Sequence, residues 1–442
     1  MTLTKRSAIA LAALGAIACS DPAGPPEGTK PITLQLCSSF GPLGWVAYQN
    51  EGGQWTQLSP GFSGSVSFDA TEKVSVAIGF DFFGASFTQV VNATADELSA
   101  EASVPCDAAF ATRTMNGTVS GLAADQTAHI TASTSTADAS AFNSSWSMED
   151  LPNSAVDIVA TRSSGFGGQP DRVLIRRGVV PPNGSIPALN FAGAEAAALE
   201  TATLTLNGIP AGVNADIATA VMTSSGTMHD LGSFAATSAS PSGAYVSLPA
   251  SLRISSDQHV LTARAVEADG DRSITYYYKS PAARTLTFGP LVSAPTLTNA
   301  ATTPYVRPRA QIASQAEYPG AVLVQWSETS PAQSTTRLVA VMTTAGFLGG
   351  TPATWTVEFP DMSSANFNPS WGLQTTTYDW VLTAFSTTTA PTDLLSPQQG
   401  VDGTVVLSSS RSSGSTLFSA PLSRAAGLIS ERRSLATMRR PR

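Results

Sequence analysis

The chain has 442 residues, which is enough for about two to four domains that each bury a core. Charged residues make up only 13% of it, about half the usual share, and the formal net charge is −8. An acidic body with no basic stripe argues against nucleic-acid binding, and an abundance of Ser, Thr and Ala in place of charge is typical of exported β proteins.

The first residues predict an export signal. Lys5 and Arg6 precede an uncharged apolar run from Ala8 to Ala18, which is the order of a secretory signal peptide. The run is too short for the roughly twenty apolar residues that span a bilayer core. We therefore expect residues 1–18 to be cleaved and the chain to leave the cytoplasm.

The segment Ala16-Ile17-Ala18-Cys19 resembles the lipobox of bacterial lipoproteins. The resemblance implies that Cys19 becomes the lipidated first residue, and Ser20 after it implies the outer membrane as destination. Acyl chains bury at about 0.8 kcal/mol per CH₂, so they would anchor the chain without a transmembrane helix. The alternative is ordinary signal-peptidase cleavage, which would give a soluble secreted protein. Residues 19–31 are rich in Pro and Gly and predict a tether.

Residues 32–107 predict a small all-β domain, here called the first segment. Short apolar runs alternate with turn signals, among them the Gly-rich turn Asn50-Glu51-Gly52-Gly53 between two strands. The segment also carries three large aromatic residues, Trp45, Tyr48 and Trp55. Rings on an exposed sheet face can stack on a glycan or a protein partner, whereas the alternative is that they fill the core.

The cysteine count predicts a disulfide in the first segment. With Cys19 assigned to lipid, Cys37 and Cys106 remain in an oxidising compartment, where an even number is normally paired. Closing a loop of this length would stabilise the fold by about 4 kcal/mol. Two separate buried thiols are the alternative.

Residues 108–200 form the second segment. The pattern Gly117-Thr-Val119, a polar turn and Leu151-Pro152 before Asp157-Ile-Val-Ala160 resembles the carboxypeptidase regulatory-like, transthyretin-like sandwich. That family is a structural accessory module, so the resemblance implies a β-sandwich and no chemistry.

Residues 201–294, the third segment, contain the clearest hairpin signal. The β-rich runs Val260–Val266 and Ser273–Tyr278 flank the turn Asp269-Gly270-Asp271. Glu267, Asp269 and Asp271 converge on this turn, and carboxylates around a glycine can bind Ca²⁺. Three acids fall short of the six to eight oxygen ligands that Ca²⁺ takes, which favours a plain turn.

Residues 295–420 form the fourth segment, and residues 421–442 predict a disordered basic tail. The run Leu373 to Ala384 resembles a fibronectin type III strand, with Tyr378, Trp380, Leu382 and Ala384 on one face at the strand period of two. The resemblance implies that Tyr378 bonds back to the backbone as a tyrosine corner.

Motifs that carry chemistry are scarce. The three histidines, His129, His229 and His259, are not at metal-ligand spacing, and there is no paired Cys-x-x-Cys and no Gly-x-Ser-x-Gly elbow. The sequence therefore predicts no catalytic residue and no cofactor. We expect His129 and His259 to occupy solvent-facing or core positions on strands.

Together these patterns predict an all-β chain of several β-sandwich modules in tandem, immunoglobulin-like or transthyretin-like. The function we expect is a non-enzymatic exported lipoprotein of the cell envelope, which is structural or binds a glycan or protein and is held to the membrane by its lipid anchor. The alternative is a secreted hydrolase or glycan-active enzyme whose site is assembled from distant residues.

Overall fold

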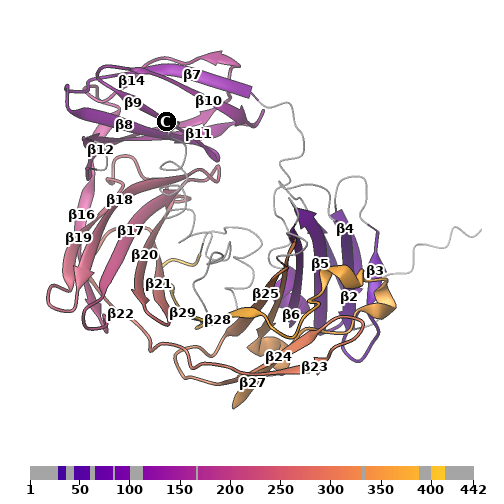
Figure 1. Cartoon of the computed structure of the whole chain (residues 1–442). Helices are drawn as coiled ribbons and strands as arrows, with labels where there is room; N and C mark the ends of the chain where they lie inside the picture. Colours follow the sequence, from indigo (N-terminus) through magenta and orange to yellow (C-terminus); the bar gives the residue numbers. More distant parts are fainter. Residues whose placement is uncertain are drawn as a thin grey trace, which may run out of the picture.

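The structure is a computed structural model, and its overall arrangement is shown in Figure 1. It is nearly all β with several sheets, which confirms the predicted fold class. The residues that the structure describes are 28–35, 44–59, 65–82, 85–99, 113–165, 168–330, 335–387 and 400–413. Among them, no helix is long and apolar enough to cross a membrane.

In the first segment, a small two-stranded sheet made of β1 and β4 packs against one end of a much larger sheet. Ile32, Val66 and Phe68 of the small sheet are buried against Val46 and Val91 of the larger one. The elements are β1 (Lys30–Gln35), β2 (Trp45–Asn50), β3 (Thr56–Leu58), β4 (Ser65–Ala70), β5 (Lys73–Phe82), β6 (Ala85–Thr94) and α1 (Ala95–Ser99).

The second segment is a β-sandwich. One sheet has the order β15-β12-β11-β8-β9, and the other is built on β7, which pairs β10, β13 and β14. Met115, Ile130, Trp146 and Leu174 fill the core between the sheets. The strands are β7 (Arg113–Ser120), β8 (Gln126–Ala132), β9 (Ser135–Ser140), β10 (Ser145–Leu151), β11 (Val156–Ser164), β12 (Pro170–Val179), β13 (Gly184–Ser185), β14 (Leu189–Asn190) and β15 (Ala196–Ala198).

The third segment packs the sheet β19-β16-β22 over β18, β17, β20 and β21, with Leu204, Ile217 and Tyr276 in the core. The predicted hairpin is confirmed, because β20 and β21 pair from His259↔Tyr278 to Glu267↔Gly270. The strands are β16 (Glu200–Asn207), β17 (Asn214–Met222), β18 (Met228–Thr237), β19 (Ser242–Ser247), β20 (Gln258–Glu267), β21 (Gly270–Tyr278) and β22 (Arg284–Thr287).

The fourth segment packs the sheet β23-β24-β27 over β25, β26 and β28 around a core that includes Trp326, Trp355 and Phe359. Tyr378 lies just before β28, and its hydroxyl donates to Asn299 Oδ1 at 2.8 Å rather than to the backbone bond of a tyrosine corner. The elements are β23 (Thr296–Ala301), β24 (Arg307–Ala313), β25 (Ala321–Ser330), β26 (Thr335–Thr344), α2 (Ala345–Leu348), β27 (Thr354–Glu358), η1 (Ser363–Ala365), η2 (Pro369–Trp371), β28 (Asp379–Phe385) and β29 (Val405–Ser412).

A twelve-stranded sheet runs through three of the four segments, in the order β18-β17-β20-β21-β29-β28-β25-β26-β6-β5-β2-β3. Two joins make it continuous. β29 lies between β21 and β28, and β6 pairs in parallel with β26. In Figure 1 the elements follow an open arc, with the second sandwich at one end and β2 to β5 at the other. The segment boundaries themselves stay predictions.

Candidate functional site

The cysteine predictions fall on residues outside the described part of the chain. Cys19, Cys37 and Cys106 all lie there, as does the basic tail 421–442. Lipidation of Cys19 and a disulfide between Cys37 and Cys106 therefore stay predictions.

The carboxylates of the predicted calcium turn are each paired with a different arginine. Arg272 Nε donates to Glu267 Oε1 at 2.6 Å, Arg264 Nε donates to Asp271 Oδ2 at 2.8 Å, and Arg411 lies 3.7 Å from Asp269. Glu267 pairs Gly270 while the neighbouring Val266 pairs Asp271, so Glu267 and Asp271 face opposite sides of the hairpin. Accordingly, the described residues contain no group of three or more His, Cys, Asp or Glu that could hold a metal ion. The arrangement is that of an ordinary hairpin turn rather than of a Ca²⁺ site with several oxygen ligands.

The aromatic residues of the first segment fill cores rather than an exposed face. Trp45 and Trp55 are 3% and 5% exposed in the core shared with the fourth segment, and Trp45 Nε1 donates to the Ala365 carbonyl at 2.8 Å. Tyr48 packs on the opposite core and stacks on Phe68 with centroids 4.5 Å apart. Because Trp45 and Tyr48 are three positions apart on one strand, they point to opposite faces and cannot form a common binding platform.

A cluster of polar contacts lies where the second segment meets the third, and we call this contact the junction. An apolar patch forms its centre, because Val159 and Val173 project from the outer face of their sheet and are buried against Val221, Leu231 and Leu248. Sheets of a sandwich normally turn polar residues outward, so an outward valine pair indicates a face that is covered by another body.

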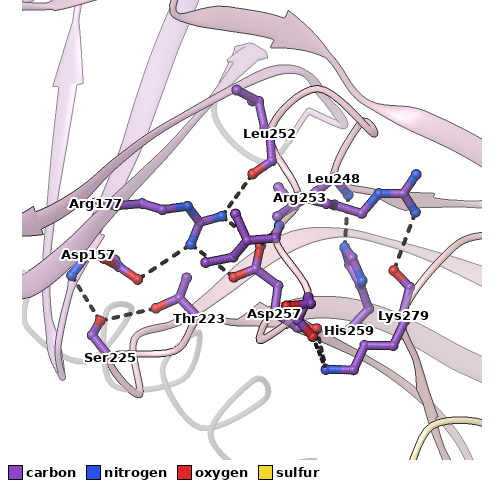
Figure 2. Close-up of polar contacts among 12 residues, drawn as sticks. Asp157, Arg177, Thr223, Ser225, Leu248, Leu252, Arg253, Asp257, His259 and Lys279 are labelled. Atoms are coloured by element: carbon purple, nitrogen blue, oxygen red, sulfur yellow. Dashed lines mark hydrogen bonds and ion pairs between the residues drawn. The ribbon is translucent and has the colours of Figure 1, made fainter.

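Arg177 crosses the junction, and Figure 2 shows its guanidinium reaching Asp257 and the Leu252 carbonyl. It lies near the end of β12, and its guanidinium donates to both oxygens of Asp257, at 2.9 and 2.6 Å, and to the Leu252 carbonyl at 2.8 Å. The same group lies 3.5 Å from Asp157 Oδ2. The Asp157 and Asp257 side chains are 4% and 1% exposed. A bidentate pair of this kind is strong and directional, and its removal would leave buried carboxylates without a counter-charge.

Asp157 also links β11 to a turn of the third segment. Its backbone N–H donates to Ser225 Oγ at 2.9 Å, and its carbonyl accepts from Thr227 Oγ1 at 3.0 Å. Its Oδ1 accepts from the Gly178 N–H at 2.9 Å. The main chain of Asp157 is therefore bonded across the junction, and its side chain is held within the second segment by Gly178 and Arg177.

His229 of β18 inserts between two threonines of the second segment. Its Nδ1 lies 2.9 Å from Thr131 Oγ1 and its Nε2 lies 3.0 Å from Thr161 Oγ1, and the residue is fully buried. His129, whose Nδ1 lies 2.8 Å from Asp138 Oδ1, has its ring centroid 5.4 Å from that of His229.

His259 lies in the third segment, behind the loop 248–257 that carries Leu252 and Asp257. It is fully buried, its Nε2 accepts the Leu248 N–H at 3.0 Å, and its ring stacks on Tyr278 at 4.9 Å. Burial, with help from Arg253 and Lys279, lowers the pKa of His259 to about 4. The ring is therefore neutral near pH 7 and acts as a hydrogen-bond acceptor.

A serine and a histidine come together here, which is the geometry that the hydrolase alternative would need. Ser247 Oγ lies 3.4 Å from His259 Nε2. Both residues are fully buried, however, and that nitrogen already accepts the Leu248 N–H. Ser247 Oγ in turn donates to the Leu248 carbonyl at 3.3 Å. In this conformation the pair supports the backbone and does not face a substrate.

The junction was not found from the sequence, because its charged residues are isolated in separate strands. The sequence predicts solvent-facing or core positions on strands for His129 and His259, and the structure places His129 partly exposed and His259 in the core. The signal that could have pointed further is a lone charge inside an apolar strand, such as Asp157 between Val156 and Ile158. Such a charge needs a partner, but the sequence does not say which residue supplies it.

Comparisons with known proteins assign no family to the chain. No protein-family model matches the chain, and no curated protein matches it. One similar solved structure is described as "Structure of the Streptococcal ancillary pilin", with 8% sequence identity and a TM-score of 0.16 over 70% of this chain and 96% of that chain.

Proposed function

We propose that the chain is a non-enzymatic, exported lipoprotein of the cell envelope that serves as a rigid β spacer or binding protein. The observation that carries this proposal is the junction, where Arg177, Asp157 and Asp257 are all committed to partners inside the chain. A network whose two carboxylates are buried fixes the relative position of two sandwiches and leaves these carboxylates with no direct route to a substrate. The twelve-stranded sheet extends the same rigid body through the other segments.

The attachment we propose is an acylated Cys19 at the outer membrane, followed by the tether 19–31. The lipid anchor would hold the rigid body at the membrane, and its outward surfaces would meet a glycan or a protein. The low charge and the many hydroxyl pairs between strands, such as Thr33 with Ser67 and Thr205 with Ser242, suit a surface that stays soluble without attracting nucleic acid.

Cell fractionation combined with mass spectrometry of the mature N-terminus tests the anchor. We expect an acylated cysteine in the membrane fraction, and a Cys19→Ser variant that is no longer held there. An unmodified N-terminus in a soluble fraction would leave only a secreted protein.

Thiol titration of the purified, unreduced protein tests the disulfide separately. We expect no reactive thiol from Cys37 or Cys106 until the protein is reduced, and one free thiol in each of the single Cys37→Ser and Cys106→Ser variants. Two thiols titrating in the unreduced, unfolded chain would overturn the pairing.

A glycan array and an envelope-protein cross-linking experiment would distinguish a binding protein from a pure spacer. A specific and saturable ligand would identify the binding role. Turnover of any glycan or ester probe by the wild-type chain would contradict the non-enzymatic proposal, and a Ser247→Ala variant would then show whether the buried Ser247 and His259 pair is responsible.

A further inference from the structure

The loop 248–257 is held at its start and at its end by different groups, and both attachments affect the junction. At its start, the Leu248 N–H donates to His259 Nε2 at 3.0 Å. At its end, Asp257 Oδ2 accepts the Ile254 N–H at 3.0 Å while the same carboxylate receives Arg177 from the second segment. The loop also presents the Leu252 carbonyl to Arg177 and the Leu248 side chain to the apolar patch.

His259 can hold Leu248 only while its Nε2 is unprotonated. In a neutral ring with Nε2 as acceptor, the proton is on Nδ1, and a second proton would turn Nε2 into a donor facing the Leu248 N–H. Two donors at 3.0 Å cannot share a hydrogen bond, and the positive ring would have to stay in a fully buried site.

The charged groups around His259 add to this cost. Arg253 and Lys279 are the cations beside the ring, and no carboxylate acts on its pKa. Asp257, just before the same strand, is paired with Arg177, and Glu200 is paired with Arg253 at 3.0 Å. The other groups that face the ring are uncharged, namely Ser247 of β19 and Tyr278 of β21, while Val221 of β17 pairs opposite it. No carboxylate among the described residues is therefore placed to pair with a protonated ring.

We propose that His259 and the loop 248–257 form an acid-sensitive latch, in which protonation of the ring frees Leu248, releases the loop from Arg177 and lets the second segment separate from the third. The direction in which acid shifts the equilibrium between the closed and open states follows from which state binds more protons. The closed site binds a proton with a pKa of about 4, whereas an exposed histidine binds it with a pKa of about 6.5. The open state therefore takes up more protons between these values, and acid favours opening. Lowering the pH from 7 to 5 shifts the closed-to-open ratio by roughly 20-fold towards the open state.

Hydrogen exchange on the full chain at pH 7 and pH 5, corrected for the intrinsic pH dependence of amide exchange, tests the latch. We expect peptides covering 248–257 and 173–179 to lose protection by roughly 20-fold at pH 5. Peptides covering 321–330 of β25 should keep theirs, because they lie far from the junction in the sheet order. Small-angle scattering should show a larger radius of gyration over the same pH range.

The matched variant is His259→Gln, whose side-chain carbonyl can accept the Leu248 N–H but does not titrate. We expect it to stay closed at pH 5, while His229→Gln still opens. An unchanged wild-type chain at pH 5, an acid response that persists in His259→Gln, or one that disappears only in His229→Gln would each overturn the latch.

If His259→Gln does not fold, nuclear magnetic resonance of the wild-type ring gives an independent answer. The chain has only three histidines, so their ring signals can be assigned. The His259 signal should titrate together with the loss of protection over 248–257. A His259 ring that titrates near pH 6.5 with the loop still protected would overturn the proposal.

Discussion

Two of the joins between segments are built in different ways. The first and fourth segments meet through main-chain pairing, with β6 and β26 in register from Ala85↔Thr336 to Asn92↔Thr343 and buried valines on both strands. The second and third meet through side chains, because no described strand of one pairs with a described strand of the other. The paired main chain of β6 and β26 carries no titratable group, although Glu97 Oε2 also accepts a hydrogen bond from Thr344 Oγ1 at 2.8 Å across this join. The junction instead depends on Arg177, two aspartates and a neutral histidine, so we expect it to respond to acid more strongly than the main-chain join.

The largest effect is expected from Arg177→Leu at the junction. Asp157 and Asp257 would remain buried without their counter-charge, so the free energy of unfolding should fall by about 3–5 kcal/mol. Denaturant unfolding at pH 7 measures this, and scattering should show separation of the two segments.

The control for Arg177→Leu is Arg309→Leu. Arg309 forms an ion pair with Glu358, and the two side chains are 41% and 28% exposed, more than the aspartates at the junction. It should cost below about 1 kcal/mol. Equal losses in the two variants would contradict the distinction between a buried junction and an exposed ion pair.

The main-chain join should be disturbed by packing rather than by charge. Met342 is fully buried and pairs Val91 across the join, so Met342→Ala should lower the free energy of unfolding by about 2–5 kcal/mol. We expect the same loss at pH 7 and at pH 5, measured by denaturant unfolding. A loss that grows in acid would show that a carboxylate at this join, such as Glu97 beside Thr344, contributes to its stability.

A smaller effect is expected where a threonine meets His229. Thr161→Val keeps the shape but removes the hydroxyl that lies 3.0 Å from His229 Nε2. A buried polar atom that loses its partner costs about 1–3 kcal/mol. Thr136→Val, on an exposed position of β9 in the same sheet, is the matched control and should change stability by less than about 0.5 kcal/mol.

The smallest effect is expected at an exposed ion pair between β1 and α1. Lys30 Nζ lies 2.7 Å from Asp96 Oδ1, but the two side chains are 44% and 91% exposed. Lys30→Ala should therefore change the free energy of unfolding by less than about 1 kcal/mol, and 1 M salt should remove most of that difference. A loss as large as that of Arg177→Leu would contradict the view that burial decides the cost.

Local patterns of the sequence were sufficient for much of the strand content. The run Trp45 to Gln49 lies within β2, and the Asp269-Gly270 turn connects β20 to β21 as predicted. Both signals act over a few residues, since alternation follows from the two-residue period of a strand and the turn from the short connection between two such runs. The glycine itself serves another purpose, because a Cβ at Gly270 would collide with the Ser410 carbonyl of β29. The same alternation placed Trp380, Leu382 and Ala384 on one face, and they pack on one core.

Pairings between residues distant in the sequence were decided only by the tertiary structure. Val90 pairs Val341, and Arg177 finds Asp257 80 residues further along the chain. Nothing near either residue in the sequence names its partner. The tertiary structure also buries Trp45 and Trp55 in a core, although the sequence allowed them to be ligand contacts. Burial lowers the pKa of His259, so its ring is neutral and accepts a hydrogen bond. The physical reason is that periodicity reports which face a side chain takes, whereas its charge state and partners depend on which other surface covers that face.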